Sequence, residues 1–405
     1  MKRSASLKVL SVALGAMGAA WMLCAPAQAQ SASDSGHWIV DTRLRYEGVA
    51  QDGLNDASAL TFRARLGYET QAFHGVRGLI EAEGVGHITD DFNDGLNGHT
   101  SYATVPDPEA IELNRLQLTW SGEHGRKATI GRQRIVLNNA RFIGNAGFRQ
   151  DEQTFDAVRL EARPLTHLGL TYIYLDNVYR TPGNRSPQYR WRSNSHVVEG
   201  DWDGAFGKLS AYAVLLDFDN APAQSSQTYG ARWQRDWNIH ENTVRLTLEA
   251  ATQSDYANAP TNFNLGYQLA EAGVRHGQWG VTLGGERLEG NDARGFSTPL
   301  ATLHAFQGWA DVFVNTPADG VRDLYLTTTY NTRPWPAAQP VAFTLSAHSF
   351  ADDSGSRDFG SELDASARFT LSPHAAIEVA AATFNGDDPR FADRDKLWVS
   401  LEYRL

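Results

Sequence analysis

The arginines of this sequence are placed so that several of them could act together on one ligand. Ten arginines before residue 160 fall on the polar side of alternating segments or in an adjoining loop: Arg43, Arg45, Arg63, Arg65, Arg115, Arg132, Arg134, Arg141, Arg149 and Arg159. A guanidinium group binds a carboxylate through two parallel hydrogen bonds, and such a pair is screened less in a narrow polar channel than in bulk water. The cluster therefore indicates passage of anions.

Each arginine, taken separately, could have a more ordinary role. A side chain on a polar face can neutralise a neighbouring acid and so hold a protein interior together. Acids suited to that role are Glu47, Glu69, Glu81, Glu83 and Glu161. Only the cluster as a whole carries the functional interpretation.

Catalysis is a competing interpretation from another class. His196 lies near Ser193 and Ser195, and His348 lies near Ser346 and Ser349, as in a hydrolase at the rim of a barrel. No sequence elbow fixes a nucleophile beside either histidine, and the required mutual geometry cannot be read from spacing. We therefore predict that the protein is not an enzyme.

Metal and cofactor sites are not indicated either. The acidic pairs Asp90-Asp91, Asp352-Asp353 and Asp387-Asp388 lack the alternating ligand spacing of a calcium loop, so we expect solvated loop tips. No cofactor is predicted.

The amino terminus predicts export. Lys2, Arg3 and Lys8 precede an apolar run that ends near Ala27-Gln28-Ala29, which is the pattern of a secretory signal peptide over residues 1–29. Cys24, the only cysteine, would be lost with it. The formal net charge of −11 then becomes −14, because cleavage removes three basic residues and no acid. An acidic chain argues against nucleic acid as a partner.

Alternation of polar and apolar residues dominates residues 30–405. In one segment Arg43, Arg45 and Glu47 oppose Leu44 and Tyr46, and the same pattern recurs through to Leu405. A strand with this pattern has one face for water and one for hydrocarbon. About eighteen such segments can be placed, including one at 126–137, an even number that is typical of bacterial outer-membrane barrels.

The connections between these segments alternate in length. Residues 123–125 and 238–240 would be tight turns, whereas 89–110, 138–153, 179–192, 256–264 and 290–320 would be long loops. We predict an all-β, transmembrane antiparallel barrel as one domain over 30–405, in the cell outer membrane. A soluble β-sandwich is the alternative, but its core could not accommodate the alternating charged face.

Two stretches resemble the alginate-export porin family. The first runs from Gly147-Phe148-Arg149-Gln150-Asp151-Glu152 to Asp156-Ala157, after Gly131-Arg132-Gln133 and Arg141-Phe142-Ile143-Gly144. The second is Phe306-Gln307-Gly308-Trp309-Ala310-Asp311, followed by Pro317, Gly320 and Asp323-Leu324-Tyr325. The resemblance implies an eighteen-stranded outer-membrane channel for a polyuronate. It also implies that Arg132, Arg141, Arg149, Gln150, Asp151, Glu152 and Asp156 belong to the constriction.

Two features depart from that family's pattern. The chain ends in Leu405 where outer-membrane barrels usually end in Phe, and its loops are modest. A general porin for small solutes is therefore an equal alternative. The expected partners are outer-membrane lipid and lipopolysaccharide, an anionic saccharide or other small solute, and export proteins of the periplasm.

Overall fold

The computed structural model describes residues 35–332 and 340–405. The predicted signal peptide, residues 1–29, lies outside the described residues.

Within these ranges the chain forms eighteen strands and two short 3-10 segments. The first nine strands are β1 (His37–Gln51), β2 (Ala57–Glu69), β3 (Val76–His87), β4 (Ala110–Ser121), β5 (Lys127–Gln133), β6 (Thr154–Leu165), β7 (Leu168–Tyr179), β8 (Arg190–Gly204) and β9 (Gly207–Leu216). The others are β10 (Ser226–Ile239), β11 (Asn242–Ser254), β12 (Asn264–His276), β13 (Trp279–Leu288), β14 (Val321–Asn331), β15 (Val341–Ala351), β16 (Asp358–Ser372), β17 (Ala375–Gly386) and β18 (Arg394–Arg404). The 3-10 segments are η1 (Pro222–Gln224) and η2 (Leu303–Ala305).

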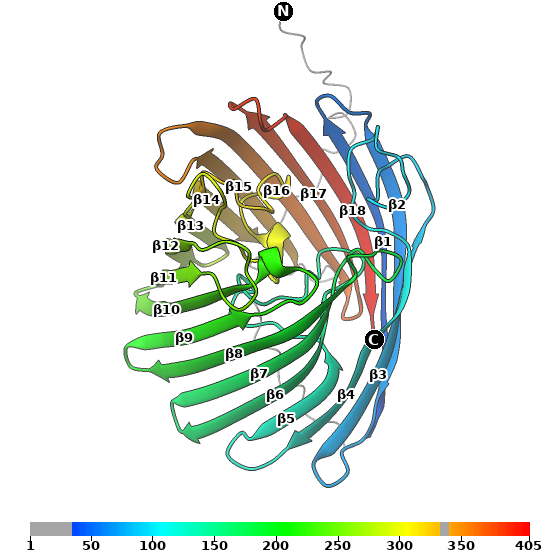
Figure 1. Ribbon diagram of the computed structural model, residues 1–405, viewed down its shortest axis with the longest axis vertical. Coiled ribbons are helices and arrows are strands. Elements are labelled where there is room, and N and C mark those ends of the chain that lie inside the picture. Colours follow the sequence, from blue (N-terminus) through cyan, green and yellow to red (C-terminus); the bar gives the residue numbers. More distant parts are fainter. Residues whose placement is uncertain (1–34, 333–339) are drawn as a thin grey trace, which may run out of the picture.

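The strands form one closed antiparallel barrel (Figure 1). Each strand pairs with the next along the chain, and β18 pairs with β1, from Asp41 opposite Arg404 to Gln51 opposite Arg394. Closure leaves no sheet edge at the join, which is the requirement for a sheet in lipid. The predicted architecture and strand number are confirmed.

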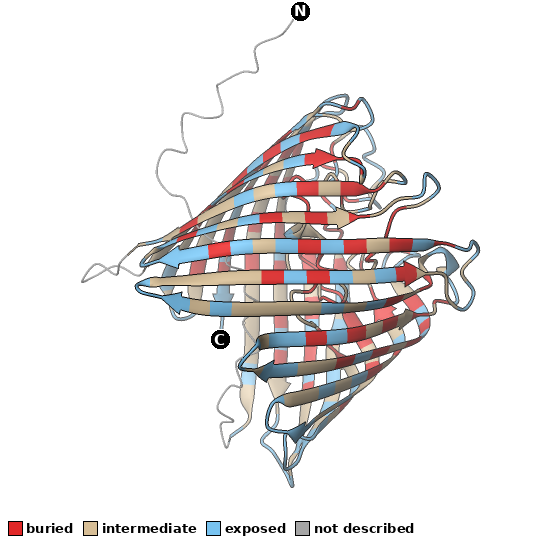
Figure 2. Ribbon diagram, turned by 90° about the vertical axis from the view of Figure 1, so that its left-hand side faces the viewer, coloured by how far each residue is buried: buried red, intermediate tan, exposed pale blue. Residues whose placement is uncertain are grey.

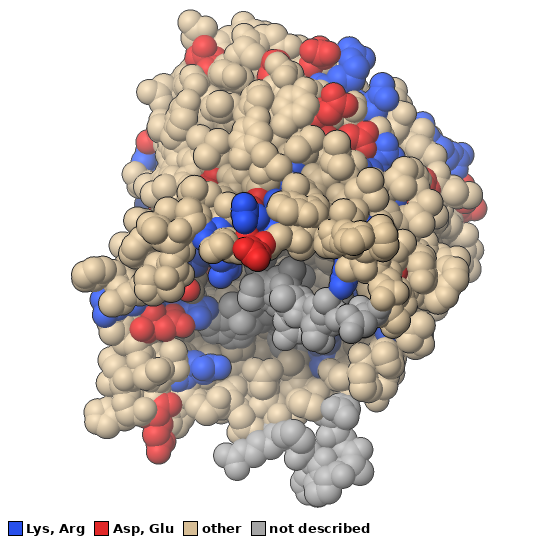
Figure 3. All heavy atoms as spheres, turned by 90° about the horizontal axis from the view of Figure 1, so that it is seen from below, with Lys and Arg blue, Asp and Glu red and all other residues tan. Residues whose placement is uncertain are grey.

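The barrel is polar inside and apolar outside in most of its wall, as the alternation predicts. In β2 the inward-facing Arg63 is 0% exposed, whereas the outward-facing Phe62 and Leu66 are 42% and 58% exposed. Buried and exposed residues alternate along the strands in Figure 2. The side of the barrel in Figure 3 is mostly free of charged side chains. An outer surface of this kind fits hydrocarbon better than water.

Short and long connections lie at opposite ends of the barrel. Short turns at 122–126, 166–167, 205–206, 240–241, 277–278 and 373–374 define what we call the short-turn side. The connections at 88–109, 134–153, 180–189, 217–225, 255–263 and 289–320 lie on the opposite, long-loop side. The predicted alternation of connection lengths is confirmed.

Among the described residues, no helix has the length and apolar character needed to cross a membrane.

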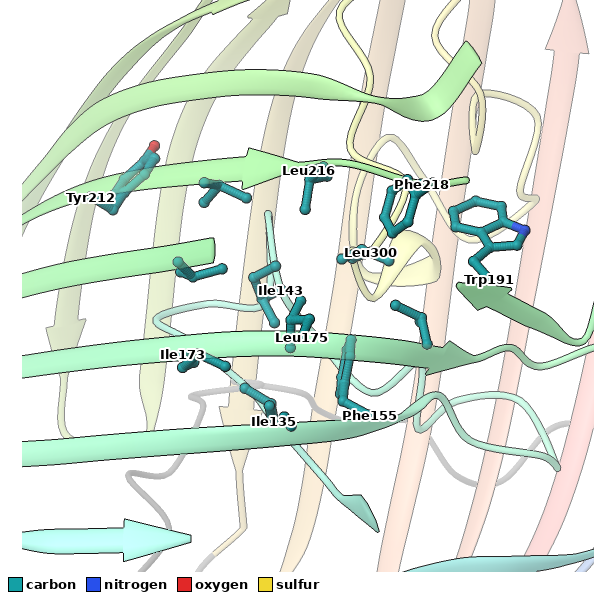
Figure 4. Packing of buried hydrophobic residues seen from close by; sticks show 14 residues of the cluster. Ile135, Ile143, Phe155, Ile173, Leu175, Trp191, Tyr212, Leu216, Phe218 and Leu300 are labelled. Atoms are coloured by element: carbon teal, nitrogen blue, oxygen red, sulfur yellow. The ribbon is translucent and has the colours of Figure 1, made fainter. Parts of the chain in front are cut away.

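Part of the inner wall is apolar, and two of the long loops cover it. Ile173, Leu175 and Val197 face inward from β7 and β8, and they pack with Ile143 and Leu300 of loops 134–153 and 289–320 (Figure 4). A second apolar cluster joins loop 289–320, through Phe296 and Phe313, to the wall from β12 to β18. The loops are thus held inside the barrel because apolar wall and apolar loop residues leave water together.

Strand β5 ends earlier than the sequence predicts. The predicted segment is 126–137, but β5 ends at Gln133, and Ile135 at the start of loop 134–153 is fully buried in the apolar cluster of the inner wall. As a result β5 pairs with β4 only from Leu116 to Ser121. The strand therefore stops pairing with β4 where Ile135 becomes part of the buried apolar cluster.

Candidate functional site

Loops 134–153 and 289–320 are joined to each other inside the barrel. The amide of Gly144 donates to the carbonyl of Leu300 at 2.8 Å, and the amide of Thr302 donates to that of Ala140 at 3.0 Å. The Gln153 side-chain amide donates to both Gly144 and Leu300, at 2.8 and 3.0 Å. The two loops therefore act as one internal unit.

The arginines of β1 anchor that unit to the wall. Arg43 donates to the carbonyls of Phe148 and Gly147 at 2.8 and 3.0 Å, and to Glu402 at 3.0 Å. The Arg45 guanidinium lies over the Phe148 ring, 4.3 Å from its centroid. Both arginines are consequently covered by loop 134–153 and serve to position it.

Arg149 joins both loops to the wall. Its guanidinium lies 2.6 Å from Asp311 of loop 289–320 and 3.4 Å from Glu47 of β1. Lys396 of β18 lies 2.7 Å from the same Asp311. Burial alone would raise the pKa of Asp311, but Lys396, His304 and Arg149 hold that pKa well below its usual range. The Asp311 carboxylate therefore stays charged and keeps the loops together.

Arg141 and Glu362 anchor the far side of the unit. Arg141 lies 2.9 Å from Glu286 of β13 and donates to Gln307 of the neighbouring loop at 3.2 Å. The amide of Ala310 donates to Glu362 of β16 at 2.7 Å. Gln307 also donates to Glu286, so loop 289–320 is tied to β13 and β16 as well as to loop 134–153.

Four more of the predicted arginines form ion pairs on or beside the β2 to β5 wall. Arg63 pairs with Asp41 and Arg65 pairs with Glu83. Arg115 binds Glu81 through two contacts of 2.8 and 2.6 Å, and Arg134 binds Glu152 at 2.7 Å.

Loop residues Asp151 and Glu152 are both buried. Burial, followed by the nearby Glu83, raises the pKa of Asp151 well above its usual range. The predicted acids therefore lie within the anchoring network.

Arg132 and Asp156 lie elsewhere than the resemblance implies. They are paired with each other across β5 and β6, and Arg132 is also opposite Leu116, which is 49% exposed on the outer face. Residues directly opposite in an antiparallel pair share a face. The register therefore places Arg132 and Asp156 on the outer side of the wall and not in the channel.

Arg132 has a structural partner there. It donates to Asp156 at 2.9 Å and to the carbonyl of Leu113 at 3.0 Å, a group that β5 no longer pairs. Arg159 does face inward, opposite Thr129, and it binds Glu161 at 2.9 Å nearer the short-turn side. Neither Arg132 nor Arg159 belongs to the loop unit.

Several residues of the site are not indicated by the arginine pattern. They are the partner groups Glu286, Asp311, Glu362 and Lys396, whereas Glu47 is among the acids expected to pair with an arginine. Each inward acid or lysine on a strand could have been found from alternation alone. Asp311 could not, because its position depends on the packing of a loop.

The catalytic alternatives lack the necessary geometry. His196 lies on the face of β8 opposite to Ser193 and Ser195, whose hydroxyls bond each other at 2.7 Å. His348 lies 3.0 Å from Asp323 and 3.6 Å from Asp364, and Ser346 bonds Thr327. The hydrogen bonds described for the two histidines go to Tyr172 and Asp323, and not to a serine hydroxyl that could act as a nucleophile.

The acidic pairs likewise have partners of their own. Asp352 accepts hydrogen bonds from Ser354 and Ser356, and Asp388 pairs with Arg390 at 2.8 Å. In the described part of the chain, no group of His, Cys, Asp and Glu side chains is arranged to hold a metal ion.

Comparison with known proteins places the fold. The sequence matches no protein-family model. It also has no match among curated proteins. Among solved structures it resembles OccAB4 of Acinetobacter baumannii, with a TM-score of 0.71 and 11% identity over 92% of this chain and 98% of that chain.

The outer membrane protein OpdK of Pseudomonas aeruginosa gives a similar result. Its TM-score is 0.69 at 14% identity, and the match covers 91% of this chain and 99% of that chain. OccK3 of the same organism gives 0.69 at 15% identity, over 92% and 96% of the two chains. None of these matches supports the alginate-export family specifically. At such identities the likeness establishes a shared architecture, the closed eighteen-stranded barrel.

Proposed function

We propose that this protein is a channel of the Gram-negative outer membrane that admits anionic solutes and is not an enzyme. The apolar outer face and closed wall support residence in a membrane, and lipid with lipopolysaccharide would surround it. Exposed aromatic residues near the short-turn side, including Trp120, Trp202 and Trp279, suit a membrane interface. The similar fold of the outer membrane protein OpdK supports the same assignment.

One observation carries the preference for anions. In the ion pairs of Arg134 and Arg115 the arginine is more exposed than its carboxylate partner: 33% against 0% for Arg134 and Glu152, and 15% against 1% for Arg115 and Glu81. The same holds for Arg149 and Glu47, at 11% and 1%. At these three pairs, solvent inside the barrel therefore meets the guanidinium group before the carboxylate. A passing carboxylate would find hydrogen-bond donors there.

The loop unit narrows the interior and would select among solutes. Loops 134–153 and 289–320 lie inside the barrel and are tied to opposite parts of its wall. OpdK, whose fold is similar, has been solved with vanillate, which is a small carboxylate. A polyuronate, as the sequence resemblance implies, and a general range of small anions remain the two candidate cargoes. Periplasmic export proteins would be partners only in the first case.

The proposal predicts a change of selectivity on substituting Arg134. In planar bilayers the protein should conduct and favour anions, and Arg134→Gln should move the anion-to-cation permeability ratio toward one, measured from reversal potentials in a salt gradient. Arg132→Gln is the matched control, because it also loses an acidic partner but lies on the outer side of the wall. Cation selectivity of the parent protein, or equal shifts in both variants, would contradict the assignment.

A second measurement separates the two cargoes. Uronate oligomers of several lengths are added, and blockage of the current is recorded. Polymer passage predicts that oligomers block and the monomer does not, because a chain that threads the loop unit stays longer than a single sugar. Equal blockage by both favours a small-solute channel.

A further inference from the structure

Three carboxyl groups meet where loop 134–153 contacts the wall at β3 and β4. Glu83 of β3 and Glu112 of β4 are directly opposite each other in the strand register, and Asp151 belongs to the loop. Asp151 and Glu83 are each 2% exposed, and Glu112 is half-buried. The Asp151 carboxyl is in hydrogen-bond contact with both of the others. We call these three residues the carboxyl cluster.

Two neighbouring segments hold Asp151 in that position. The amide of Glu152, the next residue of the loop, donates to Glu83 at 3.2 Å. Connection 180–189 closes the cluster from another side. A Cβ added to Gly183 would come within 3.1 Å of Asp151 Oδ2 and 3.5 Å of Glu112 Oε1. The cluster is therefore enclosed by the wall, the internal loop and this connection.

Hydrogen-bond donors are too few for three ionised carboxylates. Glu83 accepts from Arg65, and Glu112 accepts from the amide of Asn184 at 2.8 Å. Asp151 Oδ2 is buried and has no hydrogen-bond donor among the described residues. An ionised carboxylate can only accept, so two carboxyl groups form a hydrogen bond with each other only when one of them carries a proton. The contacts of Asp151 within the cluster therefore require a proton.

Asp151 has no counter-ion of its own among the described residues. The charged groups that act on it from the wall are Glu83 of β3, Glu112 of β4 and Arg65 of β2. Arg65 also lies 3.6 Å from Asp41 and 3.8 Å from Glu152. On the loop itself, Glu152 pairs with Arg134. Burial without a dedicated cation favours the neutral form of a carboxyl group.

These contacts give the cluster a role in seating the loop. We propose that Asp151 carries a proton while loop 134–153 is seated on the wall, and that loss of this proton as pH rises frees the loop and widens the channel. An ionised Asp151 would face Glu83 and Glu112 at close range, and movement of the loop away from the wall separates the charges. The inference rests on the proposed channel function, to which it adds a regulator of the same internal loop.

The direction of the pH effect follows from proton binding. Burial, and then Glu83, raises the pKa of Asp151 in the seated loop, whereas in a released loop the carboxyl would return to its usual pKa of about 3.9. The seated state therefore binds more protons. Seating is strongest at low pH and weakens as pH rises from about 4 to the raised pKa. One proton changes the ratio of released to seated loop by at most about tenfold per pH unit.

Conductance gives the first test. Single channels in planar bilayers are recorded from about pH 4 upward, where the carboxyl of a released loop ionises. The ratio of the wider to the narrower conductance level should rise with pH, by up to about tenfold per unit. Asp151→Asn should stay at the narrower level at every pH, because a neutral amide still donates to Glu83 and Glu112. Asp176→Asn is the control: it makes the same change at an exposed carboxyl of β7 and should keep the dependence.

Hydrogen exchange, followed by mass spectrometry, reports on the loop without any current. In the seated loop the amides of Gln150 and Glu152 donate to Asp107 and Glu83. Their protection in the parent protein should fall as pH rises. In Asp151→Asn it should not, and comparison of the two proteins at each pH removes the intrinsic effect of pH on exchange.

The outcomes for Asp151 are distinct. Full pH dependence in Asp151→Asn overturns the assignment. If that variant does not fold, Glu112→Gln replaces it. Removal of one neighbouring charge should then move the upper end of the pH range to lower pH, and an unchanged profile overturns the assignment as well.

The two readouts also separate this inference from the channel function. Anion-selective conductance with levels and loop exchange that do not change with pH would reject the role of Asp151 and leave the channel standing. Loop exchange that depends on pH through Asp151, in a protein that does not conduct, would do the reverse.

Discussion

At the scale of single residues, the arginines divide by what they can reach. Arg43, Arg45 and Arg141 are enclosed between wall and loop, where they position the loop unit. Arg134 and Arg115 remain accessible from the interior. A guanidinium that is buried between the wall and a loop is out of reach of a solute in the channel. Selectivity and loop anchoring therefore fall to different members of one cluster.

Arg149 should contribute the most to stability among these residues. Arg149→Gln leaves Glu47 and Asp311 buried without their guanidinium, although Lys396 still faces both. Breaking a buried pair by removing one partner costs about 3–5 kcal/mol, and the remaining lysine should keep the loss near the lower end. Unfolding by urea in detergent, followed by tryptophan fluorescence, measures it.

Arg159→Gln is the comparison for that prediction. Arg159 and Glu161 are partly exposed on the inner wall, so their pair is worth only about 0–1 kcal/mol. Losses of similar size in the two variants would mean that the Arg149 network does not hold the loops in place.

At the scale of elements, loop 289–320 depends on one glycine. Gly308 has a φ of +78°, and a Cβ added there would come within 2.5 Å of the Glu362 carboxyl group. That carboxylate is buried and accepts the hydrogen bond from Ala310, so it cannot move without releasing the loop. Both the backbone and the space around it require glycine.

The matched substitution is at Gly98, where φ is +80° and a Cβ would meet nothing within 4 Å. Gly98→Ala should cost only the left-handed backbone penalty of about 1–2 kcal/mol and leave conductance unchanged. Gly308→Ala should cost more and also raise the single-channel conductance, because the loop tip leaves its anchor. Identical conductance in the two variants would show that Glu362 does not secure the loop.

Local sequence pattern predicts the strands well and their ends less well. Successive residues of a strand face water inside the barrel and hydrocarbon outside it. The inward position of Arg63 and the outward position of Phe62 can therefore be predicted from the local sequence alone. The early end of β5 depends on Ile135 packing against residues far away in the chain, which include Leu300. The outward position of Arg132 follows from register, which a resemblance between motifs does not specify.

The same distinction applies to the candidate site. The sequence places Arg43, Arg45, Arg141 and Arg149 at inward positions or in one loop, and in the structure all four contact or belong to the loop unit. It does not show that apolar wall residues such as Ile173 and Val197 face inward and bury the loops. Apolar residues on the inner face can be explained only once the loops that cover them are known.

At the scale of the whole molecule, closure depends on the last strand. β18 pairs with β1 over eleven positions and with β17 over ten. Removing residues 394–405 should leave two unpaired edges and prevent folding, since lipid supplies no hydrogen bonds to them. Loss of the faster-migrating folded form in unheated gel electrophoresis would be the readout.

Removal of Leu405 alone is the control for this truncation. It lies beyond the end of β18 and contributes a single backbone hydrogen bond, to Val40 at 2.8 Å. This variant should fold. A folded form of the larger truncation would show that the sheet closes without its final strand.

The early end of β5 has a consequence for how the chain tolerates change. Where β5 leaves the wall, Asn184 of the connection 180–189 donates to the carbonyl of Ile111 at 2.6 Å and to Glu112 through its amide at 2.8 Å. Surface connections ordinarily accept insertions and deletions. This connection instead supplies hydrogen bonds to β4 that a neighbouring strand would normally supply. A residue added or lost there would therefore alter the wall of the barrel.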